Sequence, residues 1–301
     1  MLHNLWLKWA LSLGILALLV WTLDAERLRA QFSELFWPAF AVAIGCAWLA
    51  IVGAAWRWYY TARQLCLPLS LPQAVSDYFL AGLINQTLPG GVPGDITRAV
   101  RHGHRLEAHA QPWGPAFRAV IIERLSGQLM LPPVLILLWI ITPTGRMLFS
   151  QFWWQVLIGC SALALVAGLL AYKAWLPRMQ QDLKRTLYAG AWVHSLSSAL
   201  VLSSFLAAFI GSARALGIDT PTSVMLPLIP WVLLAMLIPL SVAGWGFREG
   251  AAALLWPLAG LPAEQGVAIS VSYGLVMLCS SLPGLLPLLY GPLKSMSNKV
   301  S

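Results

Sequence analysis

The sequence predicts an all-α integral membrane protein. Of its 301 residues, 59% are hydrophobic and 10% are charged, and the mean hydropathy is +0.73. Soluble domains have about 45–50% apolar and about 25% charged residues. Many of the apolar residues gather in runs of about 20, the length that a helix needs to cross the hydrocarbon core of a bilayer. Two Pro- and Gly-rich stretches interrupt this pattern, and both carry charged residues.

Seven apolar runs are long enough to be transmembrane helices, and two further segments are too short or too interrupted. We therefore expect about seven to eight transmembrane helices plus re-entrant or broken helices, in a single polytopic membrane domain over residues 1–301. We expect the first run to be retained as a signal anchor, because it contains Lys8 and lacks a convincing cleavage site. The runs cover 5–23, 36–57, 118–141, 153–172, 189–211, 223–241 and 267–290, and the partial segments cover 73–90 and 249–261.

The basic residues favour one orientation in the membrane. With a cytoplasmic N-terminus, the loops that fall inside hold most of the Arg and Lys residues, as the positive-inside rule requires. The net charge of +8 is then a signal of topology and of attraction to anionic lipid surfaces. Nucleic acid is not an expected partner, because no basic run is interleaved with aromatic residues outside the apolar runs.

No pattern in the chain indicates a cofactor, a metal or a catalytic centre. The four cysteines are scattered without Cys-x-x-Cys spacing, which is typical of small buried hydrophobic residues. Gly244-Trp245-Gly246 lacks the βαβ context of a dinucleotide loop. No nucleophile–base pair is visible, so we expect a protein that is not an enzyme.

The two Pro- and Gly-rich stretches are the strongest pointers to function. They run from Leu88 to Arg98 and from Pro239 to Gly250. Broken helices at membrane depth are tolerated only where protein buries them or where they line a wet cavity, and in transporters they mark binding sites. The stretches resemble one another, which suggests an inverted pseudo-repeat of two re-entrant elements, although Gly/Pro-rich turns can also be similar by chance. The residues expected to shape the re-entrant backbone are Pro89, Gly90, Gly94, Gly244, Gly246 and Gly250.

Charged residues next to these breaks are suited to binding a phosphate. Helix N-termini expected after Gly94 and Gly246 would attract an anion. Arg98 and Arg248 would add forked donors. We expect Glu123-Arg124, in a later span, to pair with the broken elements. Alternatively, the whole set forms ion pairs that hold two hairpins together. The residues expected at a substrate site are Asn85, Asp95, Arg98, Glu123, Arg124, Arg248 and Glu249.

Three motifs in this order resemble the lysylphosphatidylglycerol synthase transmembrane-region family, whose members are often called flippase-like. The first runs from Asn85 through Leu88-Pro89 and Gly94-Asp95 to Arg98. The second is Glu123-Arg124, and the third is Pro239 followed by Gly-x-Gly-x-Arg-Glu-Gly at 244–250. The resemblance covers about residues 5–290 and departs from the pattern at Pro93, where many members have a small residue.

The resemblance implies a lipid-handling membrane core of the bacterial cytoplasmic (inner) membrane. The chain lacks the aminoacyl-transfer domain, so we expect a stand-alone member that makes no lysyl lipid. It would be a translocase that moves a phosphate-bearing headgroup through a groove between the two re-entrant elements. Arg98 and Arg248 would hold the phosphate, and Asp95, Glu123 and Glu249 would orient these arginines or contact a cationic headgroup. The lipid would be an anionic phospholipid or a polyprenyl phosphate-linked lipid.

Two other functions stay open. The chain could be a non-catalytic membrane partner of a lipid or cell-envelope biosynthesis complex, bound to another membrane protein or to a second copy of itself. Less in keeping with the motifs, it could be a glycosyl or phosphoryl transferase that acts on a lipid carrier.

Overall fold

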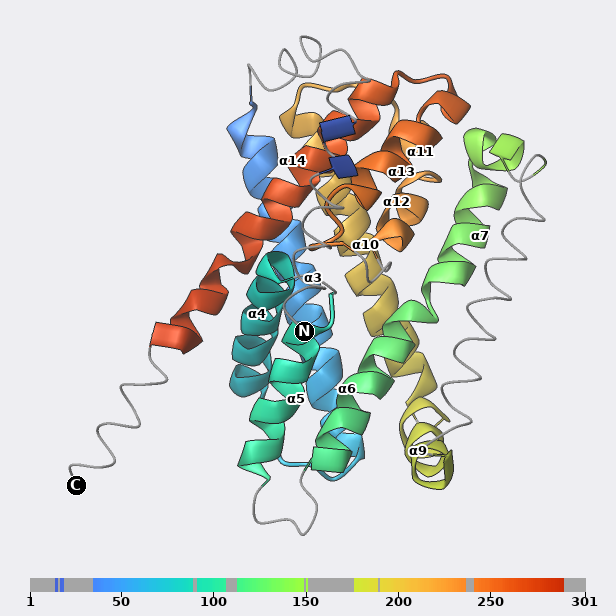
Figure 1. Cartoon of the computed structure of the whole chain (residues 1–301). Coiled ribbons are helices and arrows are strands. Elements are labelled where there is room, and N and C mark those ends of the chain that lie inside the picture. Colours follow the sequence, from blue (N-terminus) through green and yellow to red (C-terminus); the bar gives the residue numbers. More distant parts are fainter. Residues whose placement is uncertain are drawn as a thin grey trace.

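The computed structural model describes residues 35–88, 91–106, 113–148, 176–188, 190–236 and 241–289, with a few isolated residues besides. These ranges are almost entirely helical, as predicted, and the protein is an all-α membrane protein (Figure 1). The expected span 153–172 and nearly all of the expected span 5–23 lie outside the described residues. So do Pro89, Gly90 and Pro239.

Four helical segments in the described ranges are long and apolar enough to cross a membrane. They confirm the spans expected at 36–57, 118–141, 189–211 and 267–290. One of them is interrupted at Leu129 and Met130, just before Pro132 and Pro133, because proline cannot donate to the preceding turn. The segments are α3 (Trp37–Gln64), α6 with α7 (Trp113–Gln128 and Leu131–Ile141), α10 (Ala191–Ala215), and α14 (Ala263–Ser281), which continues through η3 (Leu282–Leu285) to Leu289.

The segment expected as one helix over 223–241 is not a continuous helix in its described part, 223–236, and residues 237–240 lie outside the described residues. The structure has two short helices there, α11 (Thr222–Met225) and α12 (Ile229–Ala235). Pro227 and Pro230 lie at the junction, where each removes a backbone donor and clashes with the preceding turn. The length of the apolar run therefore overestimated the length of the continuous helix.

The partial segment at 73–90 forms the first arm of a helical hairpin. α4 (Leu71–Thr87) precedes α5 (Pro93–Arg105) along the chain, and α5 packs back against α4. Asn85 joins the two arms, because its side-chain oxygen accepts a hydrogen bond of 2.8 Å from the Gly94 backbone N–H at the start of α5. A Cβ at Gly94 would overlap the Ala81 carbonyl, so glycine is what lets the arms approach.

A second hairpin is built from α12 and α13 (Phe247–Leu255), which is followed by η2 (Pro257–Ala259). α13 and η2 account for the partial segment expected at 249–261. Gly244 and Gly246 have φ angles of +83° and +84°, in the left-handed region where only glycine is unstrained. The Glu249 carboxylate accepts a hydrogen bond of 2.7 Å from the Gly246 N–H and so caps α13.

The two hairpins lie at opposite ends of the molecule. In Figure 1, α4 and α5 lie along the lower half of the long helices, whereas α12 and α13 lie along the upper half. α3 runs downward and α10 runs upward beside it, and each leads into one hairpin. This arrangement agrees with the predicted inverted pseudo-repeat, in which α3 corresponds to α10 and α4–α5 to α12–α13.

Each hairpin packs against its own hydrophobic cluster. Phe209, Trp256 and Tyr273 lie in the cluster that joins α10, α13 and α14. Trp58 belongs to a separate cluster among α3, α4, α5 and α6. Described residues that flank the two hairpin turns, among them Gly91 and Gly244, line one cavity between the long helices.

The close approach at Gly94 yields a stability prediction. Gly94→Ala places a methyl group against the Ala81 carbonyl and is expected to destabilise the fold by about 1–3 kcal/mol through overpacking. Thermal unfolding in detergent measures the change.

Gly250→Ala is the matched control on the other hairpin. The nearest described atom to an added Cβ there lies 4.0 Å away, so this substitution is expected to leave stability unchanged or to raise it by about 0.5–1 kcal/mol. Equal melting temperatures for both variants would contradict the packing argument.

Candidate functional site

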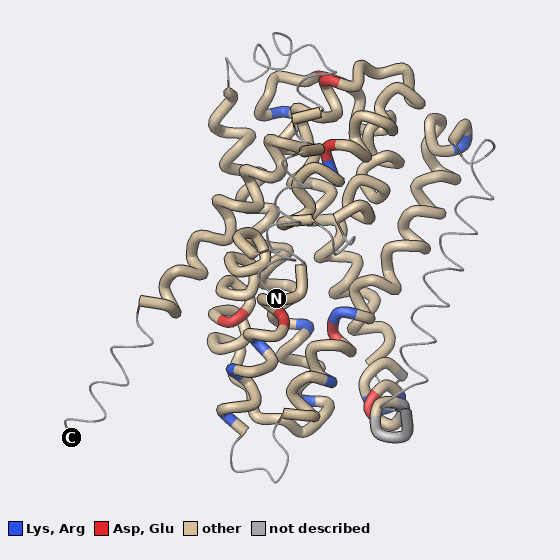
Figure 2. Tube along the Cα trace, viewed as in Figure 1, with Lys and Arg blue, Asp and Glu red and all other residues tan. Residues whose placement is uncertain are grey.

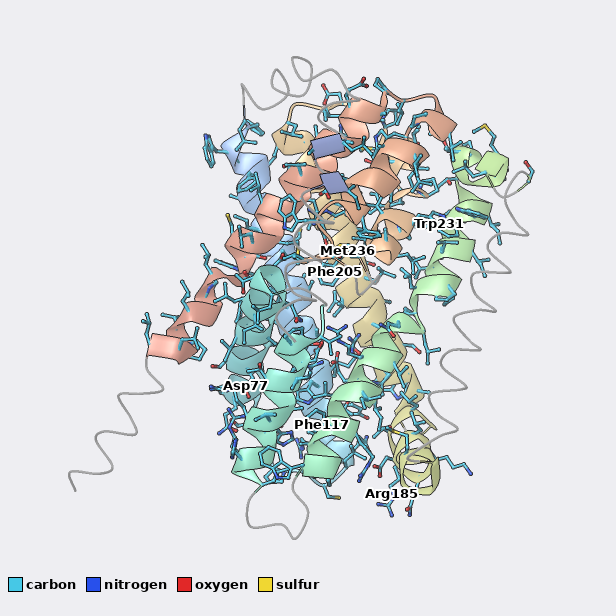
Figure 3. The ribbon with its side chains drawn as sticks, viewed as in Figure 1. Asp77, Phe117, Arg185, Phe205, Trp231 and Met236 are labelled. Atoms are coloured by element: carbon cyan, nitrogen blue, oxygen red, sulfur yellow. The ribbon has the colours of Figure 1, made fainter. Side chains whose placement is uncertain are left out.

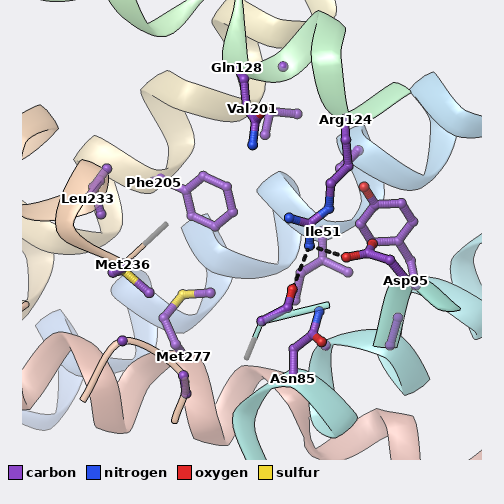
Figure 4. A pocket seen from close by; sticks show the side chains of 18 of the residues that line it. Ile51, Asn85, Asp95, Arg124, Gln128, Val201, Phe205, Leu233, Met236 and Met277 are labelled. Atoms are coloured by element: carbon purple, nitrogen blue, oxygen red, sulfur yellow. Dashed lines mark hydrogen bonds and ion pairs between the residues drawn. The ribbon is translucent and has the colours of Figure 1, made fainter. Parts of the chain in front are cut away.

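A cavity of about 390 Å³ lies between the two hairpin tips. α3, α4, α6, α10 and α14 contribute to its lining, together with the loop before α13. Polar side chains gather around Ile51 on one side of the cavity, and the opposite side is apolar, as Figure 4 shows. The polar wall includes Asn85, Gln86, Asp95, Arg124 and Gln128, and the apolar wall includes Phe205, Leu233, Met236 and Met277.

Glu123 is the centre of an ion-pair network that forms part of the cavity lining. Its side chain is fully buried, and Arg57 donates to Oε1 from Nη2 at 2.6 Å and from Nε at 3.1 Å. Arg98 Nη2 donates to Oε2 at 2.8 Å. The Tyr78 hydroxyl donates to Oε1 at 2.9 Å. One carboxylate on α6 thus binds residues of α3, α4 and α5.

Asp95 extends this network to the tip of the first hairpin. Arg98 Nε donates to Asp95 Oδ1 at 2.9 Å, and the Arg98 guanidinium lies over the rings of Trp58 and Tyr78. Arg124 forms an ion pair with Asp95 and donates to the Gly91 carbonyl at 3.1 Å. Figure 4 shows both Arg124 contacts at the edge of the cavity.

A smaller cluster lies beside the second hairpin. Arg248 Nη2 and Nε donate to Glu249 Oε1 at 2.7 and 2.9 Å, and Ser270 of α14 joins both groups by hydrogen bonds. The Arg248 guanidinium lies over the rings of Trp245 and Tyr273. A Cβ at Gly274 would overlap the guanidinium, so the arginine packs directly on the α14 backbone.

The structure brings five of the seven predicted site residues together: Asn85, Asp95, Arg98, Glu123 and Arg124. Arg248 and Glu249 form the separate upper cluster. As expected, Glu123 and Arg124 pair with the broken elements, and the three carboxylates hold the two arginines at 98 and 248. Those two arginines are buried behind the described cavity lining, whereas Asn85, Asp95, Glu123 and Arg124 line it.

Sequence reasoning missed Arg57 and Tyr78 as members of the site. Arg57 Nη1 donates to Ser198 Oγ at 2.9 Å, which ties α3 to α10. Arg57 is the last residue of the apolar run 36–57, and its position at the end of that run suggested a loop residue. The available signal for a buried role was that Arg57 continues the helical face of the apolar run 36–57.

The arrangement suits binding of an amphipathic molecule. Every carboxylate in the two clusters is engaged by arginine, and the cavity offers amide and guanidinium groups opposite an apolar wall. Within the described ranges, no group of three His, Cys, Asp or Glu side chains gathers in a way that would hold a metal ion.

Removing the central carboxylate is expected to destabilise the protein severely. Glu123→Ala leaves Arg57 and Arg98 buried without their shared partner, which is expected to cost about 3–5 kcal/mol of folding free energy. Chemical unfolding in detergent measures this change.

Tyr78→Phe is the control, because it removes one hydrogen bond to the same carboxylate and keeps the ring under Arg98. Its expected cost is about 1 kcal/mol. A Glu123→Ala protein as stable as Tyr78→Phe would show that the network contributes little to folding.

Comparison with known proteins identifies the family of the chain. The family model described as the lysylphosphatidylglycerol synthase TM region matches residues 5–284. This range includes both hairpins, the cavity lining and the Glu123-Arg124 pair. No curated protein and no solved structure matches the chain. Membership of this family links a protein to membrane lipids. Since the family model covers most of the chain, the protein belongs to the lysylphosphatidylglycerol synthase TM region family, as its three motifs predicted.

Proposed function

We propose that the protein is a lipid translocase that moves a phosphate-bearing lipid headgroup across the bacterial cytoplasmic membrane. The observation that carries this proposal is the two-walled cavity between the hairpin tips. It lies at the level of Ile51 and Ala54, near the middle of α3, and therefore at mid-depth if α3 spans the bilayer.

The two walls match the two parts of a lipid. A headgroup needs polar partners when it leaves water, and Arg124, Asn85 and Gln128 provide them. The apolar side chains opposite can contact the chain region of the lipid next to its headgroup. Figure 3 shows Phe205 and Met236, which belong to this apolar wall, close together at mid-height of the molecule. Only the headgroup then needs a polar path, while most of each tail stays in the bilayer.

The hairpins supply a route to alternating access. They approach the cavity from opposite ends, as the halves of inverted-repeat transporters do. Arg124 holds the lower tip through Asp95 and Gly91. Movement of one hairpin away from the cavity would open it to one side of the membrane, and movement of the other would open it to the opposite side.

The charge distribution supports a cytoplasmic lower end. Figure 2 shows the described Arg and Lys residues gathered toward the end where α3 stops and α10 begins. Positive residues are enriched on the cytoplasmic side of membrane proteins. Together with the expected span at 5–23, this orientation would place the N-terminus in the cytoplasm.

The first test fills the cavity. Gln128→Trp places a large ring among the lining residues, and lipid movement is expected to fall by about tenfold or more because the passage is occupied. Quenching of headgroup-labelled phospholipid by an impermeant reductant in reconstituted vesicles measures the rate.

Leu129→Trp is the matched control, because Leu129 is the next residue and is 64% exposed. Its transport rate is expected to equal that of the unmodified protein. Undiminished transport by Gln128→Trp would refute the cavity as the lipid path and would favour the non-catalytic partner function.

The second test locates the two ends. Cys66 is exposed just after α3, and the Asp219 side chain is 99% exposed beyond α10. In a chain without the other three cysteines, an impermeant maleimide is expected to label Cys66 only from the cytoplasmic side. In the Asp219→Cys variant that also lacks Cys66, labelling is expected only from the opposite side. The reverse pattern would invert the proposed orientation.

A further inference from the structure

We infer that His194 is a proton-binding site whose protonation releases the first hairpin, so that a proton gradient drives movement through the cavity. The coupling to movement rests on the proposed function, whereas proton binding and release of the hairpin do not. The inference follows from the burial of the imidazole, from its unpaired nitrogen atoms and from the charges that surround it.

His194 lies buried in the first turn of α10, where the residue is only 3% exposed. Among the described residues, neither Nδ1 nor Nε2 of its ring has a hydrogen-bond partner. The ring packs edge-on against the Tyr60 ring, with the two centroids 5.5 Å apart, so the imidazole faces α3. Buried polar atoms without partners are uncommon in native proteins, and histidine is the side chain that most readily changes its charge near neutral pH.

The imidazole lies next to the buried ion-pair network of the first hairpin. Ser198 is one turn further along the same face of α10, and its hydroxyl accepts a hydrogen bond of 2.9 Å from Arg57 Nη1. On α3, Tyr60 is likewise about one turn after Arg57. The two contacts between α10 and α3 therefore place His194 one turn from Arg57 and Ser198, both of which line the cavity.

The charges that act on His194 come mainly from this network. Arg57 on α3 and Glu123 on α6 both interact electrostatically with the imidazole, the first as a like charge and the second as an opposite charge once the ring is protonated. The other described charged side chains of α9, η1 and the start of α6 are paired or exposed, and they are Arg118, Asp182, Lys184 and Arg185.

Protonation of His194 adds a second excess charge to the network. The described members are three arginines and two carboxylates, so the network already carries one excess positive charge; they are Arg57, Arg98, Arg124, Asp95 and Glu123. A further buried positive charge is costly unless it gains a partner. Glu123 becomes that partner when Arg98 leaves with α5, because the carboxylate then serves only Arg57 and the imidazolium. Protonation therefore favours release of the first hairpin.

The place of His194 in the fold gives access from each side in turn. With the second hairpin open, water in the cavity reaches Ser198, one turn from the imidazole. With the first hairpin open, the lower end of α10 is exposed instead, and in the proposed orientation this end is cytoplasmic. A proton that binds from the outer side is thus released to the inner side, and one cycle of the hairpins moves one proton inward.

The first measurement follows the hairpin directly. Spin labels at Ile96→Cys on α5 and Leu200→Cys on α10, both at exposed positions, report the separation of the first hairpin from α10 in a chain without its native cysteines. Acidification from about pH 7.5 to about pH 5.5, the range in which histidine titrates, is expected to add a population with a longer distance. His194→Gln and His194→Asn stay neutral and are each expected to keep one distance at both pH values.

The second measurement follows the lipid. Albumin extracts a short-chain labelled phospholipid from the outer leaflet of reconstituted vesicles and so reports its distribution. A gradient of about one pH unit, acidic outside, is expected to shift the ratio between the leaflets by up to about tenfold, since one proton then carries a tenfold concentration ratio. His194→Gln is expected to remove the shift.

His104→Gln is the matched control for the lipid measurement. It removes an exposed imidazole of α5 that packs against Trp113, and the shift is expected to match that of the unmodified protein. Loss of the shift in this variant as well would overturn the assignment to His194.

The outcomes separate this inference from the proposed function. An unchanged distance in the unmodified chain, or the same longer population in the His194 variants, overturns the inference. A pH-dependent distance without any effect of the gradient on the lipid supports release of the hairpin and overturns the coupling. No lipid movement under any condition overturns the proposed function, and the spin labels then still decide whether protonation of His194 releases the hairpin.

Discussion

The buried carboxylate of Glu123 is the interaction on which the lower half of the structure depends. Arg57 on α3, Tyr78 on α4 and Arg98 on α5 all donate to it. Burying any of these polar groups alone would cost desolvation free energy, and hydrogen bonds to one shared acceptor offset that cost for all three. The position of the first hairpin relative to the long helices is therefore set by charge pairing as well as by apolar packing. Apolar packing between helices is a weak constraint where the surroundings are equally apolar lipid.

The two hairpins use the same physical devices with different residues. In each, an arginine lies over two aromatic rings and binds a carboxylate, and glycine permits a close backbone approach. Each second arm begins with a side-chain cap, provided by Asn85 in one hairpin and by Glu249 in the other. The difference lies in the third element, because Glu123-Arg124 on α6 faces the first hairpin and Ser270 on α14 faces the second. This difference makes the lower side of the cavity charged and the upper side neutral.

The fold was largely predictable because hydrocarbon imposes simple requirements on length and polarity. The spans at 36–57, 118–141, 189–211 and 267–290 were recognised because each is a mostly apolar run of about the required length. The run at 223–241 satisfied the same criterion and still divides into α11 and α12, since Pro227 and Pro230 disrupt the helical ladder there. The breaks themselves were visible as clusters of glycine and proline, and so was the similarity of the two stretches.

The sequence by itself determined the class of the protein, the two broken elements and five residues that meet at one site, because charge within an apolar chain has few stable places. Only the tertiary structure decided which arginine faces the cavity. Arg98 and Arg248 have the same local pattern as a phosphate site, and both are buried. Glu123 and the rings of Trp58 and Tyr78, all from other helices, enclose Arg98, whereas the neighbouring Glu249 and the distant ring of Tyr273 enclose Arg248. Helix packing also decided that Arg57 joins the network and that Arg124 stays accessible. The partners and exposure of a side chain depend on how helices pack, and no local pattern encodes that.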